Sequence, residues 1–464
     1  MYNYKKKRGD KMSIDFKDND YLSNIKYLDF MSDVYLGTRK IKNSKTYLHK
    51  RLIESDSAYN DRLRFSTFQN ILRKSIDNLA SILLRKKPII DFKPNSKFLV
   101  DNFDGKGTNI FNFTKELSIA ALRDGMTYIW CDSEKIEGPL NLLTAKGIRP
   151  FNKILLRKDV ISKRTGVKNG VAYIKQMVIK QKVEKEINDF ETELVDIFIV
   201  LRENGGIIYN EKEEVINSWT NNLGYVPVIP VYSAKTGFLS ADIPLLDLAD
   251  MNIEYFNKYS ELQRTLSISA SPIATIFSQD IYPNDNKGNG VDKVKDIAVG
   301  AETAIVFKDR TTEGFEWKEP HGQSIMHLMN NLNNIRTNMI NLASGILSEK
   351  KYMTATEVKV NEDNNNLFLM ELSYSLESAL TECIKMNSDF LGKTLDIKIE
   401  TNKDFELIPI DPNMVDKFIQ MKREGFISTE TFFRELIKGE ILADLDIEKE
   451  KMLIESEMSR ITAM

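Results

Sequence analysis

The chain has 464 residues and a formal net charge of −2. Hydrophobic residues make up 42% and charged residues 28%, a balance typical of globular proteins with a sizeable core. No run of about 18 apolar residues occurs, so no membrane span is predicted, and the near-zero net charge argues against a tight nucleic-acid binder. Two cysteines, Cys131 and Cys383, lack metal-ligand spacing and are expected to be reduced and buried.

The N-terminal quarter of the chain predicts helices of increasing regularity. Residues 1–57 are polar with weak periodicity, which indicates a mobile arm with a short helix or two. From Tyr59 the apolar residues recur at helical spacing, and Arg85-Lys-Lys-Pro88 would end this helix, because proline cannot continue it. A further helix is expected over 109–123, followed after Gly125 by a buried strand over 126–131.

Residues 150–233 change to the spacing of β-strands. Strands are predicted over 151–160, 171–183 and 193–201, with turn signals at 166–170 and 203–206. The stretch 224–232 contains two prolines, Pro227 and Pro230, and therefore predicts an edge strand or a passage into a linker.

Two long helices follow, separated by an insertion. The first begins at Pro244 and ends before Pro272. The second ends at about residue 347, and its apolar positions are spaced 3, 4, 3, 4, which indicates a narrow packing seam. Six asparagines lie between these positions and Arg336 is the single charge, which suggests a crowded helix or one facing something it must not bind tightly. The predicted seam residues are Ile325, Leu328, Leu332, Ile335, Met339, Leu342 and Ile346.

The insertion and the C-terminal part contain shorter elements. Short strands are predicted at 273–277, 303–307 and 315–317, with a helical turn at 292–297. The loop Ser348–Met353 breaks the second long helix, and Thr354 with Glu357 forms a capping box that starts a third helix running to about Leu391. Strands over 395–399 and 405–410 are expected to pair, and two helices follow around Gly425.

No pattern in the sequence predicts catalysis. The three histidines, His49, His321 and His327, lack the spacing of a metal site, and neither a phosphate-binding glycine loop nor GxSxG nor HExxH occurs. No catalytic residue, metal ligand or cofactor site is therefore expected, and the chain is not predicted to be an enzyme. A helix-turn-helix around Gly425 is disfavoured, because Glu430 and Glu435 lie where the second helix would meet DNA.

Several short stretches between residues 59 and 450 follow one another in a specific order and spacing. They are Tyr59-Asn-Asp-Arg62, Asn70, Ile76-Asp-Asn-Leu79, Arg85-Lys-Lys-Pro88, Gly224-Tyr-Val-Pro-Val-Ile-Pro230, Pro244-Leu-Leu-Asp-Leu-Ala-Asp-Met-Asn252, Thr354-Ala-Thr-Glu357 and Gly425-Phe-Ile-Ser428. Together they resemble the bacteriophage portal proteins, also called head-to-tail connectors. The resemblance implies an α+β, portal-like fold that is mainly helical, with long stem helices, a β-rich wing and a small α/β clip.

The family architecture implies a division of this chain into eight parts. These would be an N-terminal arm (1–58), the wing (59–235), the first stem helix (236–267), the clip (268–320), the second stem helix (321–347), the tunnel loop (348–353), a long helix returning to the wing (354–410) and the crown (411–464). The tunnel-loop residues Glu349, Lys350, Lys351 and Tyr352 would face the channel. Repeated around a ring, Lys350 and Lys351 would form a basic collar.

The resemblance also implies a function and a set of partners. Identical subunits, usually twelve, would form a ring at the unique capsid vertex, through which DNA is packaged and ejected. The ring would contact the major capsid and scaffolding proteins, the terminase large subunit, a head–tail adaptor and double-stranded DNA, with no membrane involved. The protein would be assembled in the host cytoplasm and reside in the virion.

A second hypothesis comes from the seam alone. A helical scaffold or filament-type structural subunit would associate with other copies through residues 325–346 as a coiled coil. Three heptads are close to the minimum for that assignment.

Overall fold

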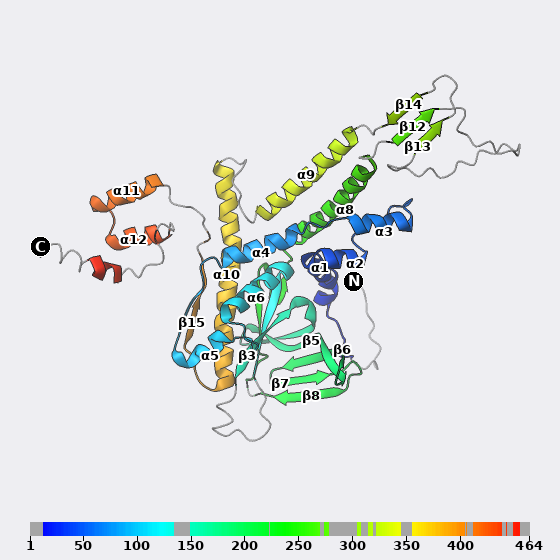
Figure 1. Ribbon diagram of the computed structural model, residues 1–464. Coiled ribbons are helices and arrows are strands. Elements are labelled where there is room, and N and C mark those ends of the chain that lie inside the picture. Colours follow the sequence, from blue (N-terminus) through cyan, green and yellow to red (C-terminus); the bar gives the residue numbers. More distant parts are fainter. Residues whose placement is uncertain are drawn as a thin grey trace. The chain divides into compact units, whose positions relative to one another are not determined.

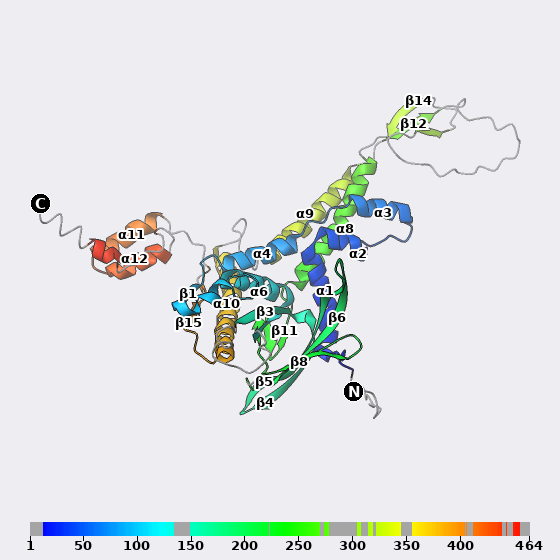
Figure 2. The ribbon, with the colours of Figure 1, turned by 60° about the horizontal axis from the view of Figure 1, so that its bottom comes forward.

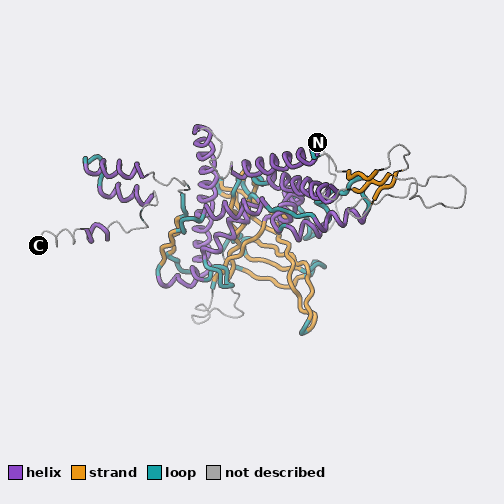
Figure 3. The backbone as a smooth tube through the Cα atoms, turned by 45° about the horizontal axis from the view of Figure 1, so that its top comes forward, coloured by secondary structure: helices purple, strands orange, loops and turns teal. Residues whose placement is uncertain are grey.

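The computed structural model describes residues 13–133, 149–221, 223–269, 273–277, 304–307, 314–318, 322–344, 355–403, 405, 412–438, 442 and 449–454. The chain divides into two compact units, Met1–Lys403 and Asp404–Met464. Helices and β-sheets both build the fold (Figure 3), so the predicted mixed α+β class is confirmed.

The N-terminal region is helical, and its residues 13–57 pack against the body, which corrects the mobile arm expected there; residues 1–12 lie outside the described residues. Its helices are α1 (Asn19–Leu36), α2 (Thr38–Ser44), α3 (Asp56–Phe65), α4 (Ile71–Leu83), α5 (Lys97–Asp101) and α6 (Ile110–Asp124). α1 buries Leu28, Met31 and Val34 and packs against α4 and α6. The periodicity is weak because only this narrow stripe is apolar, and most of the helix surface carries polar side chains.

The single helix predicted from Tyr59 onward is two helices in the structure, because the chain breaks between Phe65 and Ile71. Asn70 caps the second of them, α4, by accepting the N–H of Arg73 at 2.8 Å. The predicted helix over 109–123 is confirmed as α6, which Asn109 caps.

A three-stranded antiparallel sheet lies at the centre of the first unit. Its order is β3 (Pro150–Leu156), β2 (Met126–Ser133) and β9 (Val228–Tyr232), so the predicted buried strand and proline-containing edge strand are confirmed. Gly125 turns the chain from α6 into β2 at φ +77°, where a Cβ atom would lie 1.7 Å from the carbonyl oxygen of Asp242.

A five-stranded antiparallel meander packs against this sheet (Figure 2). It comprises β4 (Val160–Lys168), β5 (Val171–Asn188), β6 (Glu191–Arg202), β7 (Gly205–Tyr209) and β8 (Val215–Thr220). Side chains of β2, β5 and β6, among them Tyr128, Met177 and Ile199, form one shared core. The strands β7 and β8 were not predicted, because the exposed, polar β8 lacks a clear alternation.

The long helices follow in the predicted order (Figure 1). They are α8 (Leu246–Ser269), α9 (Gln323–Ser344) and α10 (Ala355–Leu391). Between α8 and α9 lies a three-stranded sheet in which β12 (Ile273–Phe277) is parallel to β13 (Ala304–Phe307) and antiparallel to β14 (Gly314–Lys318). The helical turn expected over 292–297 lies outside the described residues. Within the described part of the chain, no helix combines the length and apolar character needed to cross a membrane.

Helix α10 packs across β9, β2 and β3, on the opposite side from the five-stranded meander. There the buried thiols of Cys131 and Cys383 approach each other to 3.4 Å without forming a disulfide, which confirms the prediction that both cysteines are reduced and buried. The strand after α10, β15 (Ile397–Glu400), pairs with β1 (Ile89–Phe92). The expected pairing of this strand with 405–410 involves residues 406–410, which lie outside the described residues. Two short strands, β10 (Lys235–Gly237) and β11 (Ser240–Ala241), precede α8.

The second unit contains a helical hairpin. Its helices are α11 (Pro412–Arg423) and α12 (Thr429–Lys438), as predicted, and Gly425 turns between them at φ +81°. Ser428 caps α12 by accepting the N–H of Thr431 at 3.1 Å.

Candidate functional site

The adjacent helices α8 and α9 form the part of the fold that best fits a specialised role. The two helices pack along each other and the inserted sheet connects them (Figure 1). α8 is embedded in the body, where Leu248, Ala249 and Phe256 are buried. α9 contacts α8 and α4 through one narrow side, so most of its surface stays outside the core.

The structure places the predicted seam residues in three environments. Leu332, Ile335 and Met339 are buried, Ile325 and Leu328 are half-buried, and Ile346 lies outside the described residues. Leu342 is 40% exposed and Ala343 is buried in its place, which corrects the seam at that position. The reason is that a straight α-helix drifts by about 20° per heptad relative to a strict 3.5-residue repeat.

The outward side of α9 carries amides and a few apolar side chains. Asn330, Asn331, Asn333, Asn334, Asn338 and Asn341 are all exposed, as are Met326, Met329 and Ile340. Arg336 is also exposed and is the only Lys, Arg, Asp or Glu between 323 and 344. This side of the helix can therefore contact a surface of either charge without strong attraction.

One buried amide on α8 fixes the N-terminus of α4. The Asn252 Oδ1 atom accepts the N–H groups of Ile71 at 2.9 Å and Leu72 at 3.0 Å. Its Nδ2 atom donates to the carbonyl of Gln69 at 2.8 Å. The N–H groups at the start of a helix have no partner within that helix, and the fully buried Asn252 side chain supplies one. Asn252 therefore fixes the position of α4 on α8.

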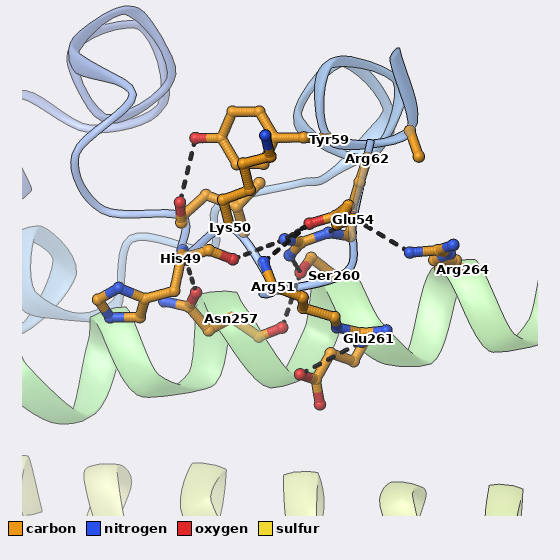
Figure 4. Close-up of polar contacts among 12 residues, drawn as sticks. His49, Lys50, Arg51, Glu54, Tyr59, Arg62, Asn257, Ser260, Glu261 and Arg264 are labelled. Carbon is orange, nitrogen blue, oxygen red and sulfur yellow. Dashed lines mark hydrogen bonds and ion pairs between the residues drawn. The ribbon is translucent and has the colours of Figure 1, made fainter. Parts of the chain in front are cut away.

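A second amide connects α8 to the chain between α2 and α3. The Asn257 Oδ1 atom accepts the N–H of His49 at 2.9 Å, and Nδ2 donates to the carbonyl of Tyr47 at 2.8 Å (Figure 4). The segment before α3 is thereby hydrogen-bonded to α8 through its backbone.

A buried ionic cluster lies beside Asn257. Arg62 donates from Nε to Oε1 of Glu54 at 2.8 Å and from Nη2 to Oε2 at 2.7 Å. Arg62 also donates to Ser260 Oγ at 3.0 Å and to the carbonyl of His49 at 2.6 Å, and Arg264 lies 3.1 Å from Glu54 Oε1 (Figure 4). The hydrogen bonds from Arg62 lower the pKa of Glu54 to about 2.

This cluster has the properties of a structural connection. Both oxygens of Glu54 accept hydrogen bonds from Arg62, and the low pKa keeps the carboxyl ionised, so it is a poor proton acceptor. Buried ion pairs of this kind add specificity of arrangement more than net stability. We therefore interpret it as the attachment that fixes α3 and the preceding turn to α8.

His49 and His327 are exposed, His321 lies outside the described residues, and no group of three or more His, Cys, Asp or Glu among the described residues could hold a metal ion. The tunnel-loop residues Glu349, Lys350, Lys351 and Tyr352 also lie outside the described residues.

Sequence reasoning missed the residues of this cluster, although one signal was available. Arg62 occupies a buried helix position beside Tyr59 and Leu63, and a charged residue at such a position needs a partner. Its charge partner Glu54 lies only eight residues earlier, but outside the helix and without helical spacing, and the contributions of Ser260 and Arg264 come from about 200 positions away.

A family model described as a domain of unknown function (DUF4055) matches residues 244–391. No curated protein matches the chain. Among solved structures, a chain from the virion of a native gene transfer agent particle is similar, with 12% identity and a TM-score of 0.39, covering 87% of this chain and 98% of that chain. A chain from the neck of a native gene transfer agent particle computed with C12 symmetry has 13% identity and a TM-score of 0.36, covering 78% of this chain and 88% of that chain.

Proposed function

We propose that this chain is a phage-type portal subunit, a structural rather than a catalytic component. In this proposal identical copies form a ring of about twelve at one capsid vertex of a virion, and DNA passes through the channel during packaging and ejection. Capsid and scaffolding proteins, a terminase and a head–tail adaptor would be its partners.

The observation that carries the proposal is the arrangement of α8, the inserted sheet and α9. A pair of neighbouring helices leads out to a small sheet and back, and α10 then returns to the wing-like sheets. This is the order expected for two stem helices flanking a clip. The sequence resemblance over residues 59–450 supports the same assignment.

The surface chemistry of α9 is consistent with a channel wall. Each phosphate neutralised by a protein cation strengthens DNA binding through counterion release. A wall that must let DNA slide should therefore carry few cations, and α9 carries only Arg336. The loop lysines Lys350 and Lys351 would be the exception, forming a narrow basic collar around the channel.

The alternative, a filament built through the 325–346 seam, is disfavoured by the burial of that seam. Leu332, Ile335 and Met339 are buried within the chain itself and are not available to a coiled-coil partner. A filament would first require α9 to separate from α8.

Negative-stain electron microscopy of the purified protein tests the proposal. Closed rings with a central channel are expected. If the protein alone stays monomeric, the measurement is repeated after co-expression with the capsid protein. Filaments would favour the alternative. Only monomers at micromolar concentration, both alone and with the capsid protein, would overturn the proposal.

A further inference from the structure

Four buried side chains join the central sheet to α10. The pairing of β2 with β3 sets Cys131 opposite Asn152, so their side chains lie next to each other on one face of the sheet. Helix α10 brings Cys383 against them, together with Asn387 one helical turn later. All four side chains are 0% exposed. The fold therefore places two thiols in contact that lie 252 positions apart in the sequence.

Hydrogen bonds hold the two sulfur atoms beside each other. The Cys131 thiol donates to Sγ of Cys383 at 3.4 Å, and the Cys383 thiol donates to Oδ1 of Asn152 at 3.0 Å. Asn152 is itself fixed, because its Nδ2 atom donates to the carbonyl of Phe103 at 3.0 Å. A covalent S–S bond is about 2.05 Å long, so the two sulfur atoms need to approach by only about 1.4 Å to form one.

The thiols are protected in their reduced form. Burial raises the pKa of the Cys383 thiol well above its usual value. The thiolate is the nucleophile in oxidation and in thiol–disulfide exchange, so a buried neutral thiol reacts slowly. Its burial also excludes bulky disulfides such as oxidised glutathione. A small oxidant is therefore required, and local opening between α10 and the sheet gives it access.

We propose that Cys131 and Cys383 form a site of oxidative modification, at which a peroxide converts the two thiols into a disulfide that holds α10 covalently on the central sheet. The thiolate of one cysteine attacks an oxygen of hydrogen peroxide, which gives a sulfenic acid and, after protonation, one water. The sulfur of the other cysteine then attacks the sulfenic sulfur, the S–S bond forms and a second water leaves. Two thiols and one peroxide thus yield one disulfide and two waters, and the two electrons pass to the peroxide.

The position of the bond gives it a structural consequence. α10 packs across β9, β2 and β3, and its Ser373 donates to Oγ1 of Thr401, directly after β15, at 2.7 Å. In the reduced chain these contacts can open together. In the oxidised chain Cys383 stays attached to β2, and the crosslink also removes conformational entropy from the unfolded chain. This inference does not depend on the portal proposal.

Peroxide treatment of the folded protein, followed by alkylation in denaturant, tests whether the bond forms. The unmodified chain should lose the mass of two hydrogen atoms and take up no alkyl group, and peptide mapping should recover Cys131 joined to Cys383. Cys131→Ala and Cys383→Ala are the matched controls, in which the remaining thiol should be alkylated. Two alkylated thiols, a sulfinic acid without a crosslink, or disulfides between chains would overturn the proposal.

Reduction of the oxidised protein tests whether the bond is the buried one. Reduced glutathione should cleave it at least about tenfold more slowly in the folded protein than in urea, because the attacking thiolate needs access to a sulfur atom. Equal rates in the two conditions would contradict a disulfide between β2 and α10.

Hydrogen–deuterium exchange of the reduced and oxidised proteins tests whether α10 is held. Amides of α10 around the buried Leu380 should exchange several-fold more slowly after oxidation, since opening of the helix from the sheet is restricted. Amides of α12, in the second unit, are the internal control and should exchange equally in both forms. Unchanged exchange of α10 after complete oxidation would overturn the claim that the disulfide holds this helix.

Discussion

The guanidinium of Arg62 holds the carboxylate of Glu54 through two parallel hydrogen bonds of 2.8 and 2.7 Å, and both side chains are almost completely shielded from water. Glu54 precedes α3 and Arg62 lies within it, while Ser260 and Arg264 reach the pair from α8. One ion pair therefore fixes the shape of a surface turn and its attachment to a long helix. The first two predictions follow from this pair.

Replacing Arg62 with alanine should destabilise the first unit strongly. The change leaves Glu54 buried with only partial compensation from Arg264, and breaking a buried pair costs about 3–5 kcal/mol. Urea unfolding followed by circular dichroism measures the loss. Arg434→Ala is the matched control, because its pair with Glu430 is exposed and should contribute less than about 0.5 kcal/mol. A similar small loss for Arg62→Ala would show that the cluster does not hold the turn.

The stability of the protein should fall steeply in acid because of Glu54. Its pKa in the folded state is about 2 against an ordinary 4.5, so its contribution is fully present above pH 4.5 and is lost as the pH falls toward 2. The contribution is about 3 kcal/mol, since a difference of one in pKa corresponds to about 1.4 kcal/mol. The free energy of unfolding of Glu54→Gln should be lower at neutral pH, and its difference from the unmodified protein should shrink below pH 4.5. A constant difference across that range would contradict the low pKa.

A negative charge introduced at two neighbouring positions of α9 should have very different effects on stability. Leu332→Asp places an unpaired carboxylate in the buried contact with α8 and should cost about 3 kcal/mol or more. Asn333→Asp changes an exposed amide and should alter stability by less than about 0.5 kcal/mol. Thermal unfolding of both variants provides the comparison. Equal destabilisation would show that the buried side of α9 is misassigned.

Changing both Lys350 and Lys351 to alanine should leave ring assembly intact and alter the handling of DNA. The portal proposal places these cations in the channel, where each would form transient contacts with passing phosphates. The measurement is the amount and length of DNA retained in filled heads at several salt concentrations. Unchanged packaging and retention across that range would contradict the claim that these lysines contact DNA in the channel.

The elements with strong periodicity or clear end signals could be predicted from the sequence. α6 between Asn109 and Gly125, the long α10 and the edge strand β9 are examples, because local spacing and breakers determine them. The break between α3 and α4 was missed, since Asn252 satisfies the start of α4 from about 180 positions away. Pairing of β15 with β1 was missed for the same reason, because partners so distant leave no local pattern.

The candidate site was predictable only in part. The seam residues Leu332, Ile335 and Met339 were identified by spacing. At the next position Ala343 is buried instead of Leu342, because a straight α-helix drifts relative to a strict 3.5-residue repeat.

The most direct test of the central claim is a cryo-electron microscopy reconstruction of the assembled protein. The account predicts a closed ring whose channel is lined by the α8–α9 pair. A ring with α8 and α9 on its outer wall, or an assembly that remains open as a filament, would contradict it.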